Sequence, residues 1–176
     1  MEGKVECRIA NEIATITFFH PQSNSLPGSL LQKLAEEITK AGKSPEAKVI
    51  ILQSEGNKAF CAGASFDELT SIENIEEGKK FFSGFAEVIN AMRKTPKFVI
   101  ARVQGKAVGG GVGLAAACDY TFATENASVK LSEIAIGIGP FVIEPAVSRK
   151  IGKTAMSQLT LAAHDWKNAQ WAFEND

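Results

Sequence analysis

The chain has 176 residues, with 20 acidic and 19 basic side chains and a net charge of -1. This balance argues against a dedicated binder of nucleic acid or of an anionic membrane, because such binding depends on an excess of lysine and arginine. A content of 45% hydrophobic and 22% charged residues excludes a disordered or collagen-like chain and indicates one globular domain over residues 1–176.

Strands and helices alternate in the first third of the sequence. Two runs rich in β-branched residues, on either side of Asn11, predict an antiparallel strand pair. A spacing of three or four between apolar residues then predicts an amphipathic helix, and an apolar run after it predicts a buried strand. The predicted strands cover residues 4–10, 12–19 and 48–53, and the predicted helix covers residues 26–43.

The same alternation continues toward the C-terminus. A long amphipathic pattern, closed by Pro96, predicts a helix with Phe81, Phe82 and Phe85 on its apolar face. The predicted helices here cover residues 75–94 and 112–118, and the predicted strands cover residues 98–103, 119–123 and 128–131. The remaining residues are helical in tendency. This order of elements indicates a single layered α/β domain.

The longest nearly uncharged stretch, residues 98–118, does not have the pattern of a membrane span. Arg102, Lys106 and the run Gly109-Gly110-Gly111 interrupt it, whereas a spanning helix needs about 20 predominantly apolar residues. The first seven residues lack the basic and then apolar plan of a secretory signal. We therefore expect a soluble, cytoplasmic chain.

The cysteines and histidines indicate neither a disulfide framework nor a metal site. Cys7, Cys61 and Cys118 are odd in number and far apart in the sequence, so free thiols are expected. No set of histidines and carboxylates has the spacing of metal ligands, and we expect no metal and no redox cofactor.

Three glycines between a predicted strand and a predicted helix are the most informative segment. Gly109, Gly110 and Gly111 would bring unpaired backbone amides and the positive end of a helix dipole to one place, which suits an anion. Two other interpretations exist. Gly111, Gly113 and Ala116 satisfy a dinucleotide-binding spacing, although the surrounding strand order argues against it. Alternatively, the glycines serve only a tight turn and close helix packing.

A second loop of small residues, 60–66, can also present a backbone amide. Two such loops build a two-donor oxyanion hole for a carbonyl oxygen that gains negative charge during a reaction. His20 and His164 lie far from both loops in sequence, and the chain has no Gly-x-Ser-x-Gly motif. These residues therefore favour stabilisation of an enolate over attack by a serine nucleophile.

Taken together, four segments resemble the enoyl-CoA hydratase/isomerase (crotonase) family. The segments are residues 60–65, 109–115, 118–119 and 131–140, and their order and spacing match over residues 4–172. The resemblance implies an α/β fold that is a spiral of repeated strand-strand-helix turns, and assembly into homotrimers or hexamers. It also implies an acyl-CoA thioester substrate, with coenzyme A as part of the substrate and no separate cofactor.

The resemblance assigns catalytic roles to three residues. The backbone amides of Ala64 and Gly110 would form the oxyanion hole, and Glu133 would be the acid/base. The further residues expected to bind substrate are Ala62, Gly63, Ser65, Phe66, Gly111 and Phe141. Gly113 stands where hydratases of the family have a second carboxylate. The pattern is similar to the mitochondrial 3,2-enoyl-CoA isomerases, which work with one glutamate.

The resemblance therefore favours double-bond isomerisation, with hydration as the alternative and a non-catalytic acyl-CoA-binding relative as a second alternative. Coenzyme A is expected along the loop 62–66, near the turn 23–25, with Lys58 as a possible phosphate contact. Glu144 is the next acid after Glu133, and its orientation stays open. Family members continue with C-terminal helices, so we expect a core domain without that helical region.

Overall fold

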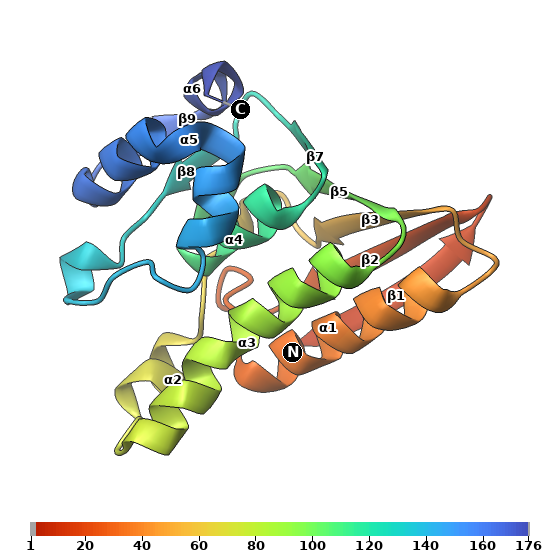
Figure 1. The fold of residues 1–176 in the computed structure, drawn as a ribbon, viewed down its shortest axis with the longest axis horizontal. Helices are drawn as coiled ribbons and strands as arrows, with labels where there is room; N and C mark the ends of the chain where they lie inside the picture. Colours follow the sequence, from red (N-terminus) through yellow and green to blue (C-terminus); the bar gives the residue numbers. More distant parts are fainter. Residues whose placement is uncertain (1–2, 176) are drawn as a thin grey trace.

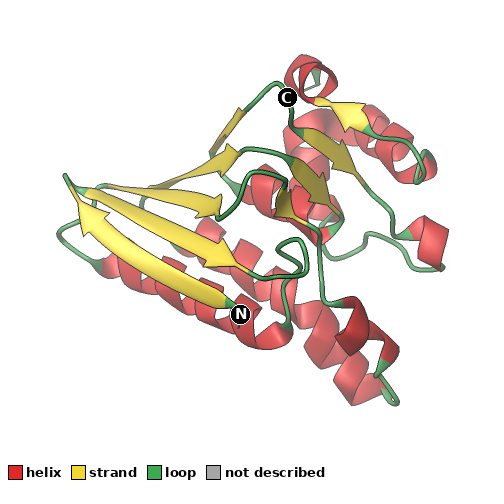
Figure 2. Cartoon of the chain, turned by 180° about the vertical axis from the view of Figure 1, so that it is seen from behind, coloured by secondary structure: helices red, strands yellow, loops and turns green. Residues whose placement is uncertain are grey.

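The computed structural model describes residues 3–175, which form two β-sheets and the helices that pack on them (Figures 1 and 2). The larger sheet has the strand order β1-β2-β3-β5-β7, with β1 and β2 antiparallel and the remaining pairs parallel. Its strands are β1 (Lys4–Ala10), β2 (Ile13–Phe19), β3 (Val49–Ser54), β5 (Phe98–Val103) and β7 (Tyr120–Ala123).

The smaller sheet has the order β4-β6-β8-β9, and only β8 and β9 are antiparallel among its described pairs. Its strands are β4 (Ala59–Cys61), β6 (Lys106–Val108), β8 (Ser128–Lys130) and β9 (Lys167–Asn168). The helices are α1 (Gly28–Lys43), α2 (Phe66–Thr70), α3 (Ile75–Lys94), α4 (Gly110–Ala117), α5 (Glu144–Leu161) and α6 (Ala169–Glu174), with a 3-10 helix, η1 (Ile134–Ile136).

Three successive turns of the chain repeat one plan. Each turn gives a strand to the larger sheet, a strand to the smaller sheet and then a helix: β3-β4-α3, β5-β6-α4 and β7-β8-α5. Because β3, β5 and β7 are parallel neighbours, as are β4, β6 and β8, the turns stack as a spiral. The α/β fold of repeated strand-strand-helix turns is confirmed.

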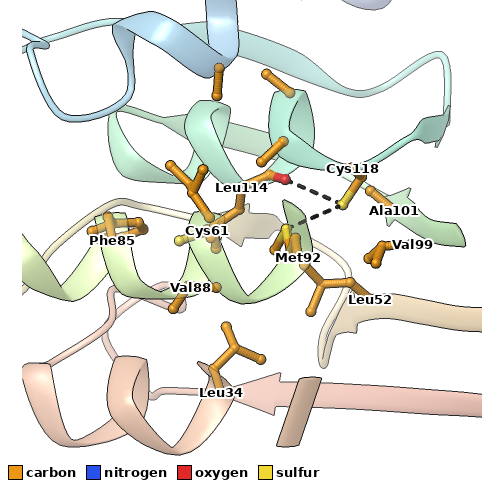
Figure 3. Packing of buried hydrophobic residues seen from close by; sticks show 14 of the residues in the cluster. Leu34, Leu52, Cys61, Phe85, Val88, Met92, Val99, Ala101, Leu114 and Cys118 are labelled. Carbon is orange, nitrogen blue, oxygen red and sulfur yellow. Dashed lines mark hydrogen bonds between the residues drawn. The ribbon is translucent and has the colours of Figure 1, made fainter. Parts of the chain in front are cut away.

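The core lies between the sheets and helices. Phe18 of β2 and Phe60 of β4 are fully buried, and their rings meet edge to face at 5.4 Å, which joins the two sheets. Helix α3 packs between α1 and α4: Figure 3 shows Val88 and Met92 of α3 between Leu34 of α1 and α4. These contacts pack α3 against both neighbouring helices.

The structure differs from the predicted elements mainly at short ones. Strands β4 and β9 and helix α2 have too few residues for a periodic pattern. Helix α4 begins at Gly110 and not at residue 112, because glycine residues carry no apolar signal. The helical C-terminal region is interrupted at Gly152, whose φ of 74° and ψ of 163° are not helical. Within the described part of the chain, every helix lacks the length or hydropathy that a membrane span needs.

Candidate active site

A cavity of about 240 Å³ lies where four segments meet. Its walls come from residues 62–66, from the start of α4, from α3 and from residues 132–143. The two loops of small residues that the sequence singled out are therefore on one cavity. Glu133 is the only ionisable side chain among the described residues that line it. A larger cavity of about 660 Å³, beside α5 and α6, contains none of the predicted site residues.

The amide of Ala64 is oriented by a short pairing with Leu26. The Leu26 amide donates to the Gly63 carbonyl at 2.8 Å, and the Ser65 amide donates to the Leu26 carbonyl at 3.3 Å. Successive amides of an extended segment point to opposite sides. The amide of Ala64 therefore points away from Leu26, on the side where Ala64 lines the cavity.

The amide of Gly110 is oriented by the start of a helix. As the first residue of α4, Gly110 has no carbonyl four residues earlier within the helix, and the amide of Gly113 already donates to Gly109 at 3.2 Å. A β-carbon built on Gly63 would lie 3.7 Å from the Gly110 nitrogen. The loop of Ala64 and the start of α4 thus form one wall of the cavity.

The Glu133 carboxylate lies beside that wall. A β-carbon built on Gly109, which has a φ of +52°, would lie 2.8 Å from Glu133 Oε1. Among the described residues, Glu133 Oε2 is buried and has no hydrogen-bond partner. Burial raises the pKa of the Glu133 carboxyl, and a hydrogen bond to its own backbone opposes this shift. Glu133 thus has the setting of a group that exchanges a proton with a ligand.

Two apolar side chains fill space that the glycines of α4 leave open. The Phe85 ring lies over Gly110, where a β-carbon would be 2.4 Å from Phe85 Cζ. Ile143, at the start of α5, lies over Gly113, where a β-carbon would be 2.3 Å from Ile143 Cγ2. The buried side chain of Ile143 therefore fills the space beside Gly113, the position at which the sequence resemblance places a second carboxylate in hydratases.

The predicted substrate-binding residues divide into two groups. Ala62, Gly63, Ser65 and Phe66 line the cavity, as expected.

Gly111 and Phe141 do not line it. A β-carbon on Gly111 would lie 2.4 Å from the Cys61 carbonyl oxygen, so Gly111 serves close packing of α4 on β4. The Phe141 side chain is 81% exposed and folds over Gly139. The geometry does not support these two expectations. Gly110 and Pro140, the residues directly before them, line the cavity, whereas Gly111 and Phe141 lie away from it.

Other candidate residues have roles in the fold. Glu144 accepts a hydrogen bond from the Ser148 hydroxyl at 2.5 Å and does not line the cavity. Asn24 is buried, and its side-chain amide donates to the carbonyls of Glu55 and Ala59 at 2.9 Å each. The turn at residues 23–25 is thereby tied to β4.

The cysteines do not provide a nucleophile near the cavity. All three are free, and burial raises the pKa of the thiols of Cys61 and Cys118 to about 12. A thiol with such a pKa is protonated at neutral pH and is a weak nucleophile. Among residues 3–175, no group of three or more potential metal ligands is close enough to hold an ion.

Sequence reasoning missed Leu69, Ser132, Val142 and Ile143 as lining residues, and it placed Phe81, Phe82 and Phe85 only on the buried face of a helix. Figure 3 shows Phe85 at one end of the core, beside Cys61. The run of phenylalanines in the N-terminal half of α3 was the available signal, because these large apolar side chains line the cavity.

Comparison with known proteins decides the family. The sequence profile described as enoyl-CoA hydratase/isomerase matches residues 8–172. The chain belongs to the enoyl-CoA hydratase/isomerase family. This match includes both amide-bearing loops and Glu133.

Two relatives and one structure illustrate the similarity within the enoyl-CoA hydratase/isomerase family. The chain is 32% identical to the short-chain-enoyl-CoA hydratase of Clostridium acetobutylicum, over 89% of this chain and 60% of that protein. It is 36% identical to the mitochondrial methylglutaconyl-CoA hydratase of Rattus norvegicus, over 66% of this chain and 37% of that protein. The crystal structure of an enoyl-CoA hydratase from Bacillus anthracis superposes with a TM-score of 0.89 at 30% identity, covering 97% and 67% of the two chains.

This family member therefore spans about half the length of the curated relatives it matches: 49% of a Bacillus subtilis protein named a probable enoyl-CoA hydratase and 60% of the Clostridium hydratase. The residues that the family profile matches, 8–172, contain the whole cavity wall described above. The glycines for which a dinucleotide site was the other interpretation lie within the residues that the enoyl-CoA hydratase/isomerase profile matches.

Proposed function

We propose that this chain carries the catalytic core of an enzyme that moves the double bond of an enoyl-CoA thioester. The observation that carries the proposal is the position of Glu133 against Gly109, which directly precedes Gly110; Glu133 is the one ionisable side chain among the described residues that line the cavity. One acid/base group beside two converging amides is the arrangement that enolate chemistry at a thioester requires.

In the proposed reaction, the thioester oxygen accepts hydrogen bonds from the amides of Ala64 and Gly110. Glu133 removes a proton from C2, and the electron pair of that bond delocalises onto the thioester oxygen, giving an extended enolate. The electrons then return through C2=C3, and C4 takes the proton back from Glu133. The double bond moves from C3=C4 to C2=C3 with no other reactant. The raised pKa of Glu133 suits both proton transfers.

Both parts of the site are needed for a useful rate. One oxyanion-hole donor contributes about a hundred- to a thousandfold, and one positioned acid/base contributes about a hundred- to ten-thousandfold. Neither contribution dominates, so removing either an amide donor or the carboxylate should lower the isomerisation rate by a readily measured factor.

Ile143 favours isomerisation over hydration. Hydration adds a water molecule across the double bond, and that water must be held and activated by polar groups. At Gly113, where a second carboxylate would serve this purpose, the side chain of Ile143 leaves no room. Hydration is the second candidate function, because the Clostridium relative is named a short-chain-enoyl-CoA hydratase.

Turnover of a matched substrate pair tests the proposal. We expect wild-type protein to convert a 3-enoyl-CoA faster than it hydrates the 2-enoyl-CoA of the same length. Glu133→Gln should lower isomerisation by about a hundred- to ten-thousandfold. Glu144→Gln is the matched control, because Glu144 does not line the cavity, and it should keep the wild-type rate. Faster hydration would contradict the isomerase proposal, and acyl-CoA binding without turnover would indicate a non-catalytic relative.

The volume of the cavity limits how much of the substrate it can enclose. A cavity of about 240 Å³ is smaller than the roughly 300–1,000 Å³ of most whole-ligand sites, so it would hold the acyl end while coenzyme A lies outside along residues 62–66.

We further propose a cytoplasmic homotrimer or hexamer, without a separate cofactor. Sedimentation equilibrium would contradict this by showing a monomer at working concentration.

A further inference from the structure

We propose that Asn24 is a positioning residue for this site, because its side chain fixes the turn that aims the Ala64 amide at the substrate oxygen. The inference rests on the function proposed above and adds to it a residue that does not line the cavity. Asn24 is only 4% exposed, and a buried amide side chain needs hydrogen-bond partners for both its oxygen and its nitrogen. The structure gives both atoms backbone partners.

The oxygen of the Asn24 side chain closes the turn in which Asn24 lies. Oδ1 accepts a hydrogen bond from the His20 amide at 2.9 Å, and the Asn24 amide donates to the His20 carbonyl at 3.0 Å. Ser23 and Asn24 have φ values of 55° and 57°, in the left-handed region that residues with a β-carbon rarely adopt. Asparagine tolerates this region because its short side chain bonds to nearby backbone groups. The shape of the turn therefore depends on Asn24.

The nitrogen of the same side chain ties the turn to the segment that carries the oxyanion hole. Nδ2 donates to the carbonyls of Glu55 and Ala59, at 2.9 Å each. Ala59 is the first residue of β4, and β4 leads directly into the loop of Ala64. Because one nitrogen bonds both carbonyls, Asn24 fixes the turn against the beginning of this segment.

Leu26, two residues after Asn24, holds the other end of the segment. Its amide donates to the Gly63 carbonyl at 2.8 Å, and its carbonyl accepts from the Ser65 amide at 3.3 Å. The turn thus grips residues 59–65 at both ends, and the direction of the Ala64 amide follows from this grip. Without the Asn24 side chain, the turn keeps only its contacts through Leu26. The misplacement of a reacting group by about 1 Å can cost about a hundredfold in rate.

Kinetics of Asn24→Gly test the inference, because glycine removes the side chain and still suits a positive φ. We expect kcat for isomerisation of a 3-enoyl-CoA to fall about ten- to a hundredfold, with a much smaller change in KM. A merely structural role would lower the thermal midpoint and leave kcat of the folded protein unchanged. An unchanged kcat in Asn24→Gly would therefore overturn the inference.

Asn168→Ala is the matched control. Asn168 also uses its side chain to bond backbone, since its Oδ1 accepts from the Trp171 amide at 2.8 Å, but it lies away from the cavity of Glu133. Loss of this helix cap should lower the thermal midpoint and keep the wild-type kcat. A comparable fall of kcat in Asn168→Ala would show that general destabilisation causes the effect, and would overturn the inference.

The infrared spectrum of bound butanoyl-CoA, with carbon-13 at the thioester carbonyl, reports on the oxyanion hole without turnover. Hydrogen bonds to the carbonyl oxygen weaken the C=O bond and lower its stretching frequency. Butanoyl-CoA has no double bond to isomerise. We expect binding to wild-type protein and to Asn168→Ala to lower this frequency equally, and binding to Asn24→Gly to lower it less. Equal shifts in all three proteins would contradict a role of Asn24 in aiming the amide.

An ester at position 64 shows whether Asn24 acts through this amide. Incorporation of lactic acid there replaces the N–H by an oxygen atom and keeps the methyl side chain. Asn24→Gly should lower kcat much less in the ester protein than in wild type, because the donor that Asn24 positions is already absent. An equal fold-loss of kcat in both backgrounds would mean that Asn24 acts elsewhere, and the inference would fail.

The outcomes separate the inference from the function on which it rests. If wild-type protein neither isomerises a 3-enoyl-CoA nor binds butanoyl-CoA, the proposed function fails, and the inference fails with it. If wild-type protein isomerises the substrate and Asn24→Gly keeps both kcat and the infrared shift, the function stands and the inference alone fails. Asn24→Ser repeats the comparison if Asn24→Gly does not fold, since Ser23 beside it has a similar φ and a serine lacks the amide donor.

Discussion

The carboxylate of Glu133 lies directly against the α-carbon of Gly109, so that a β-carbon at this glycine would be 2.8 Å from Oε1. Gly109 also has a φ of +52° and a ψ of -118°, a conformation that other residues rarely adopt. The glycine therefore has two functions at once: it turns the chain from β6 into α4, and it lets the proposed acid/base approach the amide of Gly110.

Gly109→Ala should impair both stability and activity. The backbone conformation costs about 1–3 kcal/mol for a residue with a β-carbon, and the methyl group displaces the Glu133 carboxylate. Gly56→Ala is the control, because Gly56 has a φ of +89° and no atom within 4 Å of the added methyl group. Urea unfolding should show a loss of stability in both variants. Isomerase kinetics should show a loss of rate only in Gly109→Ala. Equal rates in the two variants would contradict the contact.

The pH dependence of stability should reveal the burial of Glu133. Burial raises the pKa of its carboxyl above the ordinary value of 4.5, so the native state keeps this proton to higher pH than the unfolded chain does. Between the unfolded and the raised native pKa, the native state binds more protons, and the free energy of unfolding falls as pH increases. The stabilising contribution is complete below the unfolded pKa and is lost as pH rises through the native pKa.

Glu133→Gln removes this titration. The free energy of unfolding of this variant should not decrease as pH rises through the native pKa of Glu133. Above that pH, the variant should therefore be more stable relative to wild type than it is at low pH. The isomerase rate of wild type should rise with pH through the same native pKa, because the base must be ionised. Urea unfolding over a pH series measures the first effect, with Glu144→Gln as control. Parallel stability curves for Glu133→Gln and wild type would show that the carboxylate is hydrated.

The sequence predicted the long elements because their patterns reflect burial. The apolar spacing of α1 corresponds to Leu31, Leu34 and Ile38, which are almost completely buried, and the apolar run of β3 contains Ile50 and Leu52, which are fully buried. Such patterns depend only on which side of an element faces the core. They say nothing about which side of a loop faces a cavity.

For this reason the site was predicted unevenly. The glycine run and the small-residue loop indicated where backbone amides are exposed, and the structure places both on one cavity with Glu133. The orientation of Phe141 and Gly111 depends on single turns of the backbone, for which the sequence has no pattern. The contact of Ile143 with Gly113 joins two helices distant in sequence, and only tertiary packing determines it.

The amide of Ala64 can be tested by replacing it with an ester. Incorporation of lactic acid at position 64 removes the N–H and keeps the side chain. The rate should fall by about a hundred- to a thousandfold, as for loss of one oxyanion donor, with little loss of stability. The matched control is the α-hydroxy analogue of serine at position 65, because the Ser65 amide donates to Leu26.

The control should show the reverse result, a loss of about 1 kcal/mol in stability from the broken hydrogen bond and a smaller loss of rate. Thermal unfolding and isomerase kinetics on both esters provide the comparison. A position-64 ester with wild-type kinetics would show that this amide does not contact the reacting thioester.

Gly113→Ala tests whether the Ile143 side chain fills the space that a side chain at position 113 would need. The added methyl group meets Ile143 Cγ2 at 2.3 Å and Cβ at 2.7 Å, and overpacking of this kind costs about 1–3 kcal/mol. The gain in helix propensity from glycine to alanine is at most about 1 kcal/mol, so we expect net destabilisation. Gly78→Ala in α3 is the control, since its nearest neighbour is 3.7 Å away, and it should stabilise the protein by up to about 1 kcal/mol.

The double variant Gly113→Ala with Ile143→Ala isolates the contact itself. Ile143→Ala alone should cost about 2–5 kcal/mol, because it leaves a cavity in the core. The double variant should cost less than the sum of the two single variants, since the two changes act on the same space. Chemical denaturation of the four proteins gives the coupling energy. Strictly additive costs would show that Ile143 does not contact Gly113. The space beside Gly113 would then be open, and Gly113→Glu should place a carboxylate there and raise the rate at which a 2-enoyl-CoA is hydrated.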